Sequence, residues 1–386
     1  MSVLAVGLMA GTSLDGVDAA LVRVGDREIE LVAFRTVPYS PGLRGRIEAV
    51  LDAGRTPEIA DLHVALGEFF ADGVLEVLDL AQVVPSAVAY VASHGQTVWH
   101  QPRRVSLQLG SPSVIAERTT IPVISDFRSA DVAAGGEGAP LVPMADAMLF
   151  GHRDQGRILL NIGGMANLTW VRRLAELETV MAFDTGPGMV LVDAVARATD
   201  PAKPYDLDGV RASHGKVVRE VLRRVLADAY FDRKPPKSTG REYFGARAAT
   251  RLLDAVRGSG GSDADALATA VAVTAQSVAD QVARWLPEES ANVDVVLSGG
   301  GAHNATLLDM LRRAVAPRAV VRFDDLFFSG AAKEAASFAY LGWRTVRSQP
   351  GSLAVVTGAR SARVLGSITS APGRAIGVFD GWGSAS

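Results

Sequence analysis

The stretch GLMAGTSLDGVDAALV, residues 7–22, contains an apolar run, a turn of small and polar residues, and a second apolar run. A later stretch, LLNIGGMANLTWV at residues 159–171, repeats this arrangement. Each pattern predicts two strands joined at a turn where glycine lets the backbone take a positive φ or approach another group closely. One such hairpin in each half of the chain indicates either a duplicated fold, with one hairpin per domain facing a shared cleft, or two unrelated hairpins.

Outside these hairpins, short apolar runs alternate with longer segments of helical spacing. The runs rich in β-branched residues lie at residues 3–8, 88–92, 123–125, 158–161, 180–183, 293–297 and 320–323. From Asp263 to Leu286, apolar side chains recur every three or four residues, which predicts one long helix. Strands that alternate with helices predict an α/β fold with mixed sheets.

The composition favours a two-domain enzyme and excludes several classes of protein. The chain has 386 residues, of which 48% are apolar and 21% charged, and a net charge of −3. A charge near zero without a Lys/Arg block argues against a nucleic-acid partner. The absence of cysteine excludes disulfides, Cys-zinc sites and thiol nucleophiles, and it fits a cytoplasmic protein.

A membrane partner is also unexpected. The longest mostly apolar internal stretch, residues 266–275, is far below the roughly 18 residues of a membrane span. The N-terminal MSVLAVGLMAG has no Lys or Arg ahead of it and runs into a turn, so it predicts a buried first strand and no signal sequence.

The turn GTSLDG at residues 11–16 carries two hydroxyls and one carboxylate, those of Thr12, Ser13 and Asp15. Backbone amides freed by glycine, together with these hydroxyls, would hold a phosphate group. The alternative is a plain hairpin turn stabilised by its own Ser and Asp side chains. A P-loop is excluded because the chain contains no G-x-x-x-x-G-K-[ST] motif.

A second glycine turn follows the apolar run at residues 293–297, where Gly299, Gly300 and Gly301 precede Asn304 at the start of a predicted helix. Such a turn lets a nucleotide lie against the backbone near a helix N-terminus, or it lets strand and helix pack closely. The spacing is not the G-x-G-x-x-G fingerprint of a dinucleotide site.

Asp184, in the segment AFDTGPG, follows an apolar strand and precedes a turn without bulky side chains. A carboxylate in that position suits a general base. Equally, it suits the N-cap of the next helix.

Polar residues His94, Gln96 and Thr97 follow another apolar strand and predict a loop that contacts substrate. The spacing of His94 and His100 fits none of the usual metal motifs, so no protein metal site is expected.

Three segments read as loops or ends. Residues 133–143 form a linker or a loop lining the cleft, and residues 233–240 form an excursion on the surface. Residues 237–242, which begin at Lys237, form a solvated loop or an anion site. The Gly/Ser-rich tail at residues 381–386 is expected to fray.

Together, the small-residue turns and the one well-placed carboxylate are features that phosphoryl transfer uses.

Taken in order, the motifs resemble those of the 1,6-anhydro-N-acetylmuramic acid kinase family. The matching segments include GLMAGTSLDGVDAAL, SHGQTVWH, DFRSADVAAGGEGAPLVP, LNIGGMANLT, FDTGPGM, KSTGREYF, SGGGAHN and AKEAASFA, spanning residues 7–339. The resemblance implies the actin/sugar-kinase/Hsp70 fold, in which two duplicated ribonuclease-H-like domains flank a central ATP cleft. It implies residues 1–130 with 330–386 as one domain, and 131–329 as the other, with the adenosine-binding motif.

The same resemblance assigns the site residues. The first phosphate loop would include Gly11, Thr12, Ser13, Asp15, Gly16 and Asp18, the second Gly163, Gly164 and Asn167, and the nucleoside would lie on Gly299, Gly300, Gly301 and Asn304. His94, Gln96, Thr97, Arg128 and Glu334 would line the sugar and phosphate region. The helix at residues 333–339 would connect the domains at the hinge.

The implied reaction consumes ATP, carried with Mg²⁺, and water, and it gives N-acetylmuramic acid 6-phosphate in peptidoglycan recycling. Asp184 would take the proton of the attacking water. The resemblance also implies a cytoplasmic homodimer. Met189, Ser111 and Ala331 depart from the family pattern, which has Asn, Asp and Asp there, and none of them removes the base.

Two alternatives stay open. Another sugar kinase of the superfamily would act on an unbridged amino sugar, with Asp184 deprotonating a sugar hydroxyl. An actin- or Hsp70-like binding module would hydrolyse nucleotide without sugar, whereas either kinase would require sugar for turnover.

Overall fold

The computed structural model describes residues 2–11 and 13–374. By its own contacts the chain divides into a first unit, Met1–Leu149 with Ala332–Ser386, and a second unit, Phe150–Ala331. Thr12 and the tail at residues 381–386, both singled out in the sequence, lie outside the described residues.

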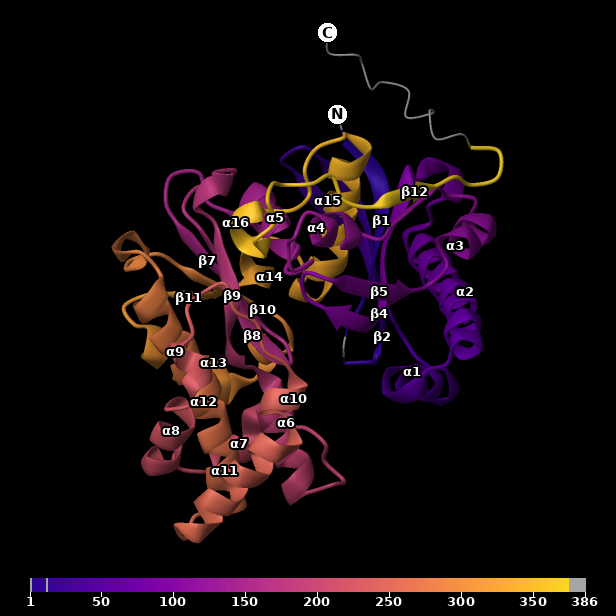
Figure 1. Ribbon diagram of the computed structural model, residues 1–386. Helices are drawn as coiled ribbons and strands as arrows, with labels where there is room; N and C mark the ends of the chain where they lie inside the picture. Colours follow the sequence, from indigo (N-terminus) through magenta and orange to yellow (C-terminus); the bar gives the residue numbers. More distant parts are fainter. Residues whose placement is uncertain (1, 12, 375–386) are drawn as a thin grey trace. The chain divides into compact units, whose positions relative to one another are not determined.

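The sheet of the first unit is mixed (Figure 1). Strands β1 (Ser2–Ala10), β2 (Gly16–Gly25) and β3 (Ile29–Pro38) form an antiparallel meander. On the other side of β1, β4 (Tyr90–Gln101) and then β6 (Val123–Ser125) run parallel to it. The short β12 (Ser367–Thr369) extends the sheet beyond β6, and β5 (Val105–Leu109) pairs with the end of β4.

The second unit repeats this plan. Strands β7 (Arg157–Ile162), β8 (Met165–Val171) and β9 (Met181–Pro187) form the meander, and β10 (Val295–Ser298) and β11 (Val320–Arg322) add the parallel strands beside β7. The strand orders β6-β4-β1-β2-β3 and β11-β10-β7-β8-β9 are therefore equivalent. This topology is that of a ribonuclease-H-like domain, so the predicted α/β fold and its duplication are confirmed.

Helices cover both sheets. Those of the first unit are α1 (Pro41–Ala53), α2 (Thr56–Ala81), α3 (Pro112–Thr119), α4 (Ser129–Ala133), α5 (Val142–Ala145), α15 (Lys333–Val346) and α16 (Ala354–Thr357). Those of the second are α6 (Met189–Thr199), α7 (Val210–Ser213), α8 (Arg219–Leu226), α9 (Ala229–Asp232), α10 (Arg241–Phe244), α11 (Ala246–Gly258), α12 (Asp263–Trp285), α13 (Ala305–Val315) and α14 (Phe323–Leu326). The long helix predicted from Asp263 is confirmed, and Ser262 begins it with a capping box.

Both faces of β1 are buried, each against a different layer. Val6 and Leu8 belong to the core cluster that includes Leu66 and Phe70 of α2. Gly7, which points to the opposite face, lies against α15, so closely that a Cβ there would overlap the Ala335 carbonyl oxygen. The N-terminal segment is therefore the buried strand that the sequence predicted. No helix in the described part of the chain is long and apolar enough to cross a membrane.

The glycine-rich passage at residues 133–143 belongs to the first unit, which continues to Leu149, beyond the expected boundary at residue 130. Its anchor is Asp131, which is fully buried. The Asp131 carboxylate accepts hydrogen bonds from Gly138 N (2.9 Å) and Thr357 Oγ1 (2.8 Å). Because these bonds tie the passage to its own unit, its interpretation as an interdomain linker is wrong.

Substitution of Gly7 by alanine is expected to lower the free energy of unfolding by about 3 kcal/mol or more, because the methyl group must displace helix α15. Gly45→Ala is the matched control: nothing lies near its Cβ position in α1, so it should stabilise by about 0.5–1 kcal/mol. Urea denaturation of both variants measures the difference. Equal stabilities would contradict the close contact of β1 with α15.

Candidate active site

In the second unit, the predicted phosphate and nucleoside turns meet at one edge of the sheet. Strands β7, β9 and β10 point the same way, so their carboxyl ends share this edge, where ligands bind in α/β sheets. The carbonyls of Gly163 and Gly164 accept hydrogen bonds from Met189 N (2.8 Å) and Gly188 N (2.9 Å) at the start of α6. The turn at Gly163 thus contacts the segment that follows Asp184.

Asp184 lies near the end of β9, opposite Asn167 of β8. Its carboxylate Oδ2 accepts a hydrogen bond from Thr239 N (2.9 Å), and no hydrogen bond from a described residue reaches Oδ1. Helix α6 begins after Gly188, and its N-terminal amides are bonded to the Gly163 turn. The N-cap interpretation of Asp184 is therefore wrong, and one carboxylate oxygen is left to bind another group.

The environment of Asp184 suits a base. Burial raises the pKa of its carboxyl group to about 6, while the Thr239 amide and the charge of Lys237 oppose that rise. A carboxylate with this pKa is ionised at neutral pH and is a stronger proton acceptor than an exposed aspartate.

The loop at residues 233–240, which was expected to be solvated, is partly buried instead. Lys237 is only 5% exposed, and its backbone carbonyl accepts a hydrogen bond from Asp184 N (3.0 Å). Tyr230, which the sequence did not single out, donates its hydroxyl to the Asp184 carbonyl oxygen (2.7 Å). Nothing in the local sequence AYFD distinguishes this tyrosine from a core residue.

The glycines of the SGGG turn have different tasks. At Gly299, with φ of 85°, a Cβ would lie 2.7 Å from the Ile162 carbonyl oxygen, and at Gly301 it would lie 2.5 Å from the Ile162 side chain. These two glycines allow close packing of the turn on β7. Gly300 has open space around its Cβ position, as does Gly164, so a ligand has room to approach the backbone at these positions.

Asn304 begins helix α13. Its side-chain oxygen accepts a hydrogen bond from Leu307 N (2.9 Å), which confirms the predicted helix start. The side chain is 3% exposed, and its Nδ2 has no hydrogen-bond partner among the described residues.

In the first unit, the corresponding edge gathers the turn after β1 and the residues near the end of β4. Gln96, which is fully buried, donates to the Gly11 carbonyl oxygen (3.3 Å) and accepts from the Tyr39 hydroxyl (3.0 Å). Ser13 Oγ donates to Asp15 Oδ1 (2.6 Å), so the turn also has the internal bond of a plain hairpin. Gly16 is required by packing, because a Cβ there would overlap the Val37 carbonyl oxygen.

Asp18 is a half-buried carboxylate at this edge. It accepts a hydrogen bond from Thr36 Oγ1 (2.5 Å) through Oδ1. Burial raises its pKa, the Thr36 bond opposes that rise, and the nearby Asp15 charge adds to it. Asp18 is therefore held on the strand β2 with one oxygen already bonded.

The segment SHGQTVWH is part of strand β4, so the prediction of a loop is wrong. Pairing with β5 keeps its polar residues in the sheet, and Thr97 Oγ1 accepts a hydrogen bond from Gln108 Nε2 (3.2 Å). His94 is 3% exposed, and Arg128 donates to its Nε2 (2.8 Å from Nη2). Because arginine only donates, the His94 proton lies on Nδ1, which donates to the Gly95 carbonyl oxygen (2.7 Å).

Burial, and next to it the Arg128 charge, lowers the pKa of His94 to about 3, so the imidazole is neutral. Arg128 also donates from Nη1 to the Gly138 carbonyl oxygen (2.8 Å), and burial lowers its pKa to about 10. Glu334, in the first turn of α15, has a raised pKa because of burial, and the charges of Lys333 and Arg128 oppose that rise. Neutral His94 and the ionisable side chains of Arg128 and Glu334 therefore form one polar cluster in the first unit.

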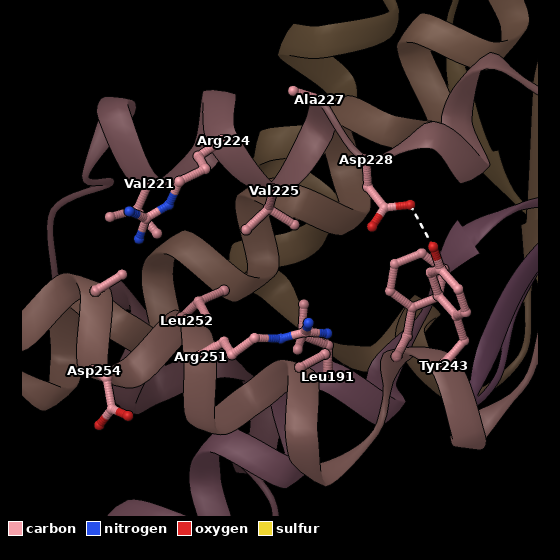
Figure 2. Close-up of a pocket in the computed structure, with 13 residues that line it drawn as sticks. Leu191, Val221, Arg224, Val225, Ala227, Asp228, Tyr243, Arg251, Leu252 and Asp254 are labelled. Carbon is pink, nitrogen blue, oxygen red and sulfur yellow. Dashed lines mark hydrogen bonds between the residues drawn. The ribbon is translucent and has the colours of Figure 1, made fainter.

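A cavity of about 630 Å³ lies elsewhere in the second unit, among helices α6, α8, α10 and α11 (Figure 2). Leu191, Val221, Val225 and Leu252 supply apolar side chains to its wall. Two arginines and two aspartates also line it, so it offers no net charge, and none of the predicted site residues faces it. At one end, the Tyr243 hydroxyl points to Asp228 and donates to Oδ1 (2.6 Å).

The family model described as anhydro-N-acetylmuramic acid kinase matches residues 3–371 of this sequence. The chain belongs to the anhydro-N-acetylmuramic acid kinase family. It is 39% identical over 382 residues to the protein of that name from Caldanaerobacter subterraneus subsp. tengcongensis, covering 95% of this chain and 96% of that one. It is 42% identical over 383 residues to the one from Salinibacter ruber, with coverage of 95% and 96%.

Among solved structures, it resembles component A of the Acidaminococcus fermentans (R)-2-hydroxyglutaryl-CoA dehydratase, with 15% identity and a TM-score of 0.47 over 88% of this chain and 98% of that one. As a member of the anhydro-N-acetylmuramic acid kinase family, the chain is a sugar kinase, a phosphotransferase that uses ATP and an alcohol group as acceptor.

The structure shows where the three residues that depart from the family pattern lie. Ser111 is the N-cap of α3, where its hydroxyl accepts a hydrogen bond from Val114 N (3.4 Å), a task that Ser and Asp perform equally well. Met189 is the first residue of α6, and Ala331 is exposed just before α15. None of the three contacts the Asp184 carboxylate through a hydrogen bond.

Asp184→Asn is expected to stabilise the protein above pH 6. The folded-state pKa lies above the unfolded value, so the native state binds more protons between about pH 4 and 6, and stability falls as pH rises through that range. Asparagine removes this loss, a gain of about 2–3 kcal/mol at pH 8 that vanishes near pH 4. Urea unfolding at both pH values, with the exposed Asp254→Asn as control, measures it; a pH-independent difference would contradict the buried charge.

Proposed function

We propose that this chain opens 1,6-anhydro-N-acetylmuramic acid with water and phosphorylates its O6, with Asp184 as general base, in the recycling of peptidoglycan sugars. Water adds its oxygen to the anomeric carbon while the bond from that carbon to O6 breaks. The freed O6 forms a bond to the γ-phosphorus of ATP, and ADP leaves. Asp184 takes the proton of the water and later releases it, so the products are N-acetylmuramic acid 6-phosphate, ADP and a proton.

The observation that carries this proposal is the state of the Asp184 carboxylate. It is ionised at neutral pH, half-buried, fixed through Oδ2 by the Thr239 amide, and without a hydrogen bond from any described residue at Oδ1. A base must be held in place and still have a free lone pair for the proton that it accepts. Water held at Oδ1 would meet both conditions.

Glycine turns would hold ATP. We assign the triphosphate to the backbone at Gly11, Gly163 and Gly164, where the glycines leave room around their Cβ positions. The nucleoside is assigned to the backbone at Gly300, beside the first turn of α13. Gly16, Gly299 and Gly301 are then structural glycines that shape these turns.

Mg²⁺ is assigned to the phosphates of ATP. Among the described residues, no group of three or more His, Asp or Glu side chains is gathered that could hold a metal ion by itself. In kinases, Mg²⁺ is bound by the phosphates of the substrate together with one or two carboxylates of the protein. Asp18, whose Oδ2 makes no hydrogen bond to a described residue, is the carboxylate we assign to it. Bound there, the ion would neutralise charge on the phosphates.

For the sugar, we assign Arg128, Thr97 and Glu334 to direct contacts, and His94 and Gln96 to support. Both ring nitrogens of His94 are occupied by protein groups, and Gln96 is fully buried between Gly11 and Tyr39. Family membership further supports a cytoplasmic homodimer, which light scattering on the purified protein would test.

The reaction is tested by turnover of 1,6-anhydro-N-acetylmuramic acid with Mg-ATP in ¹⁸O-labelled water. We expect a phosphorylated sugar with one ¹⁸O at the anomeric carbon and none in the phosphate, formed faster than unlabelled product exchanges in the same water. Asp184→Asn should lower kcat by about 10²- to 10⁴-fold or more.

If only an unbridged amino sugar elicits ADP release, the chain is instead another sugar kinase. A near-wild-type rate for Asp184→Asn would exclude Asp184 as the base.

The different surroundings of Gly300 and Gly301 lead to a separate prediction. Gly300→Ala should leave thermal stability near that of the wild type and weaken ATP binding by about tenfold or more, because its methyl group enters the space assigned to the nucleoside. Gly301→Ala, the matched control, should lower stability by about 1–3 kcal/mol, since its methyl group meets Ile162. Calorimetric titration with ATP and thermal unfolding distinguish the two effects; unchanged ATP affinity in Gly300→Ala would sink the nucleoside assignment.

A further inference from the structure

Lys237 is a buried cation that the mechanism above leaves without a task. Its ammonium group donates hydrogen bonds to the carbonyl oxygens of Tyr230 (3.2 Å) and Phe231 (3.5 Å) in the short helix α9. It also lies 4.6 Å from the centre of the Tyr230 ring, on which a cation is attracted by the π electrons. A lysine only 5% exposed, in a loop of this composition, requires an explanation beyond solubility.

The contacts of Lys237 close a ring around Asp184. Asp184 N donates to the Lys237 carbonyl oxygen (3.0 Å), Lys237 Nζ donates to the Tyr230 carbonyl oxygen, and the Tyr230 hydroxyl donates back to the Asp184 carbonyl oxygen (2.7 Å). Thr239, two residues beyond Lys237, supplies the amide that holds the Asp184 carboxylate. Both peptide groups of Asp184 and one carboxylate oxygen are therefore fixed by two elements that Lys237 joins.

Helix α9 is itself anchored, so the ring has a firm support. Asp228 accepts hydrogen bonds from Tyr230 N (2.9 Å) and from the Tyr243 hydroxyl, the contact drawn in Figure 2. Gln281 of α12, which is 1% exposed, donates to the Phe231 carbonyl oxygen (3.0 Å). The carbonyl oxygen of Phe231 thus accepts hydrogen bonds from both Gln281 and Lys237.

We propose that Lys237 is a positioning residue that, as a cation, closes this ring, fixes the Asp184 carboxylate and favours its ionised form. The proposal rests on the proposed role of Asp184 as general base. In this proposal Lys237 itself contacts neither the substrate nor ATP. Its positive charge and its two hydrogen bonds act through the loop and the strand end that they hold.

Charge supports this role as well as geometry. Burial lowers the pKa of Lys237 to about 8, the nearby arginines add to that effect, and the two aspartates oppose it. The ionisable groups facing Lys237 are Asp184 of β9, Tyr230, Asp232 and Arg233 at α9, and Arg284 of α12. Arg284 and Asp232 pair with each other (2.5 Å), whereas Asp184 makes no salt bridge within the part of the chain that the structure describes. The Lys237 charge lowers the pKa of Asp184 against the effect of burial.

The test compares Lys237→Met, Lys237→Arg and Lys234→Met in the full-length chain, through the pH dependence of kcat and kcat/KM with 1,6-anhydro-N-acetylmuramic acid and Mg-ATP. Lys234 is exposed on the same loop and is the matched control. For the wild type we expect activity to fall below about pH 6, as Asp184 is protonated, and above about pH 8, as Lys237 loses its proton.

Lys237→Met should lower kcat about ten- to a hundredfold, with the KM for ATP little changed, because the base is misplaced. Its acid limb should move to higher pH by roughly one unit, since the opposing charge is lost. Lys237→Arg should keep the acid limb and move the alkaline limb to higher pH, because arginine stays charged. Lys234→Met should match the wild type.

Two results would overturn the proposal. One is a folded Lys237→Met with wild-type kcat and an unmoved acid limb, and the other is a Lys237→Arg whose alkaline limb stays at the wild-type pH. If Lys237→Met does not fold, the alkaline limb of Lys237→Arg decides alone. Failure of the base assignment is distinguishable, because it would appear as a near-wild-type rate for Asp184→Asn, whereas failure of the present proposal leaves the loss of kcat in Asp184→Asn unchanged.

Discussion

Each unit depends on one central strand, β1 or β7, that accepts an antiparallel neighbour on one side and a parallel neighbour on the other. This pairing forces the first hairpin turn and the ends of the third and fourth strands to the same edge of the sheet. Every glycine turn assigned to ATP, and Asp184, lies on such an edge. Close contact between the central strand and the next layer then restricts which residues the strand can contain. In β1, for example, only glycine fits at position 7 against α15.

Local patterns predicted the features whose cause is local. Both hairpins, the helix beginning at Asp263 and the helix start at Asn304 follow from periodicity, small-residue turns and caps. Gln96 and Thr97 were wrongly expected in a loop, because a run of polar residues does not show that it belongs to a strand unless its partner strand, β5, is known. Lys237 was expected in solvent because its burial depends on carbonyl groups of α9, which the sequence of its own loop does not reveal.

The three glycines of the SGGG turn also show that local sequence does not reveal contacts with distant parts of the chain. From the sequence, Gly299, Gly300 and Gly301 are equivalent, and ligand approach and close packing explain them equally well. The structure divides them, because Ile162 of β7 lies against two of them and leaves space beside the third. Close packing is therefore confirmed for Gly299 and Gly301, and ligand approach stays a prediction for Gly300. The property that distinguishes them is the position of another strand, some 140 residues earlier in the chain.

The ionised form of Asp184, the proposed base, is a source of instability that the surrounding residues must offset. Burial makes the Asp184 carboxylate basic, and the same burial opposes its ionisation in the folded state. Extra hydrogen bonds to both oxygens would lower that cost, but they would also occupy the lone pair that a proton acceptor needs. The observed arrangement resolves this conflict by placing one amide on Oδ2 and the remaining contacts on the Asp184 peptide groups. Rigidity then comes from the backbone, and basicity stays with Oδ1.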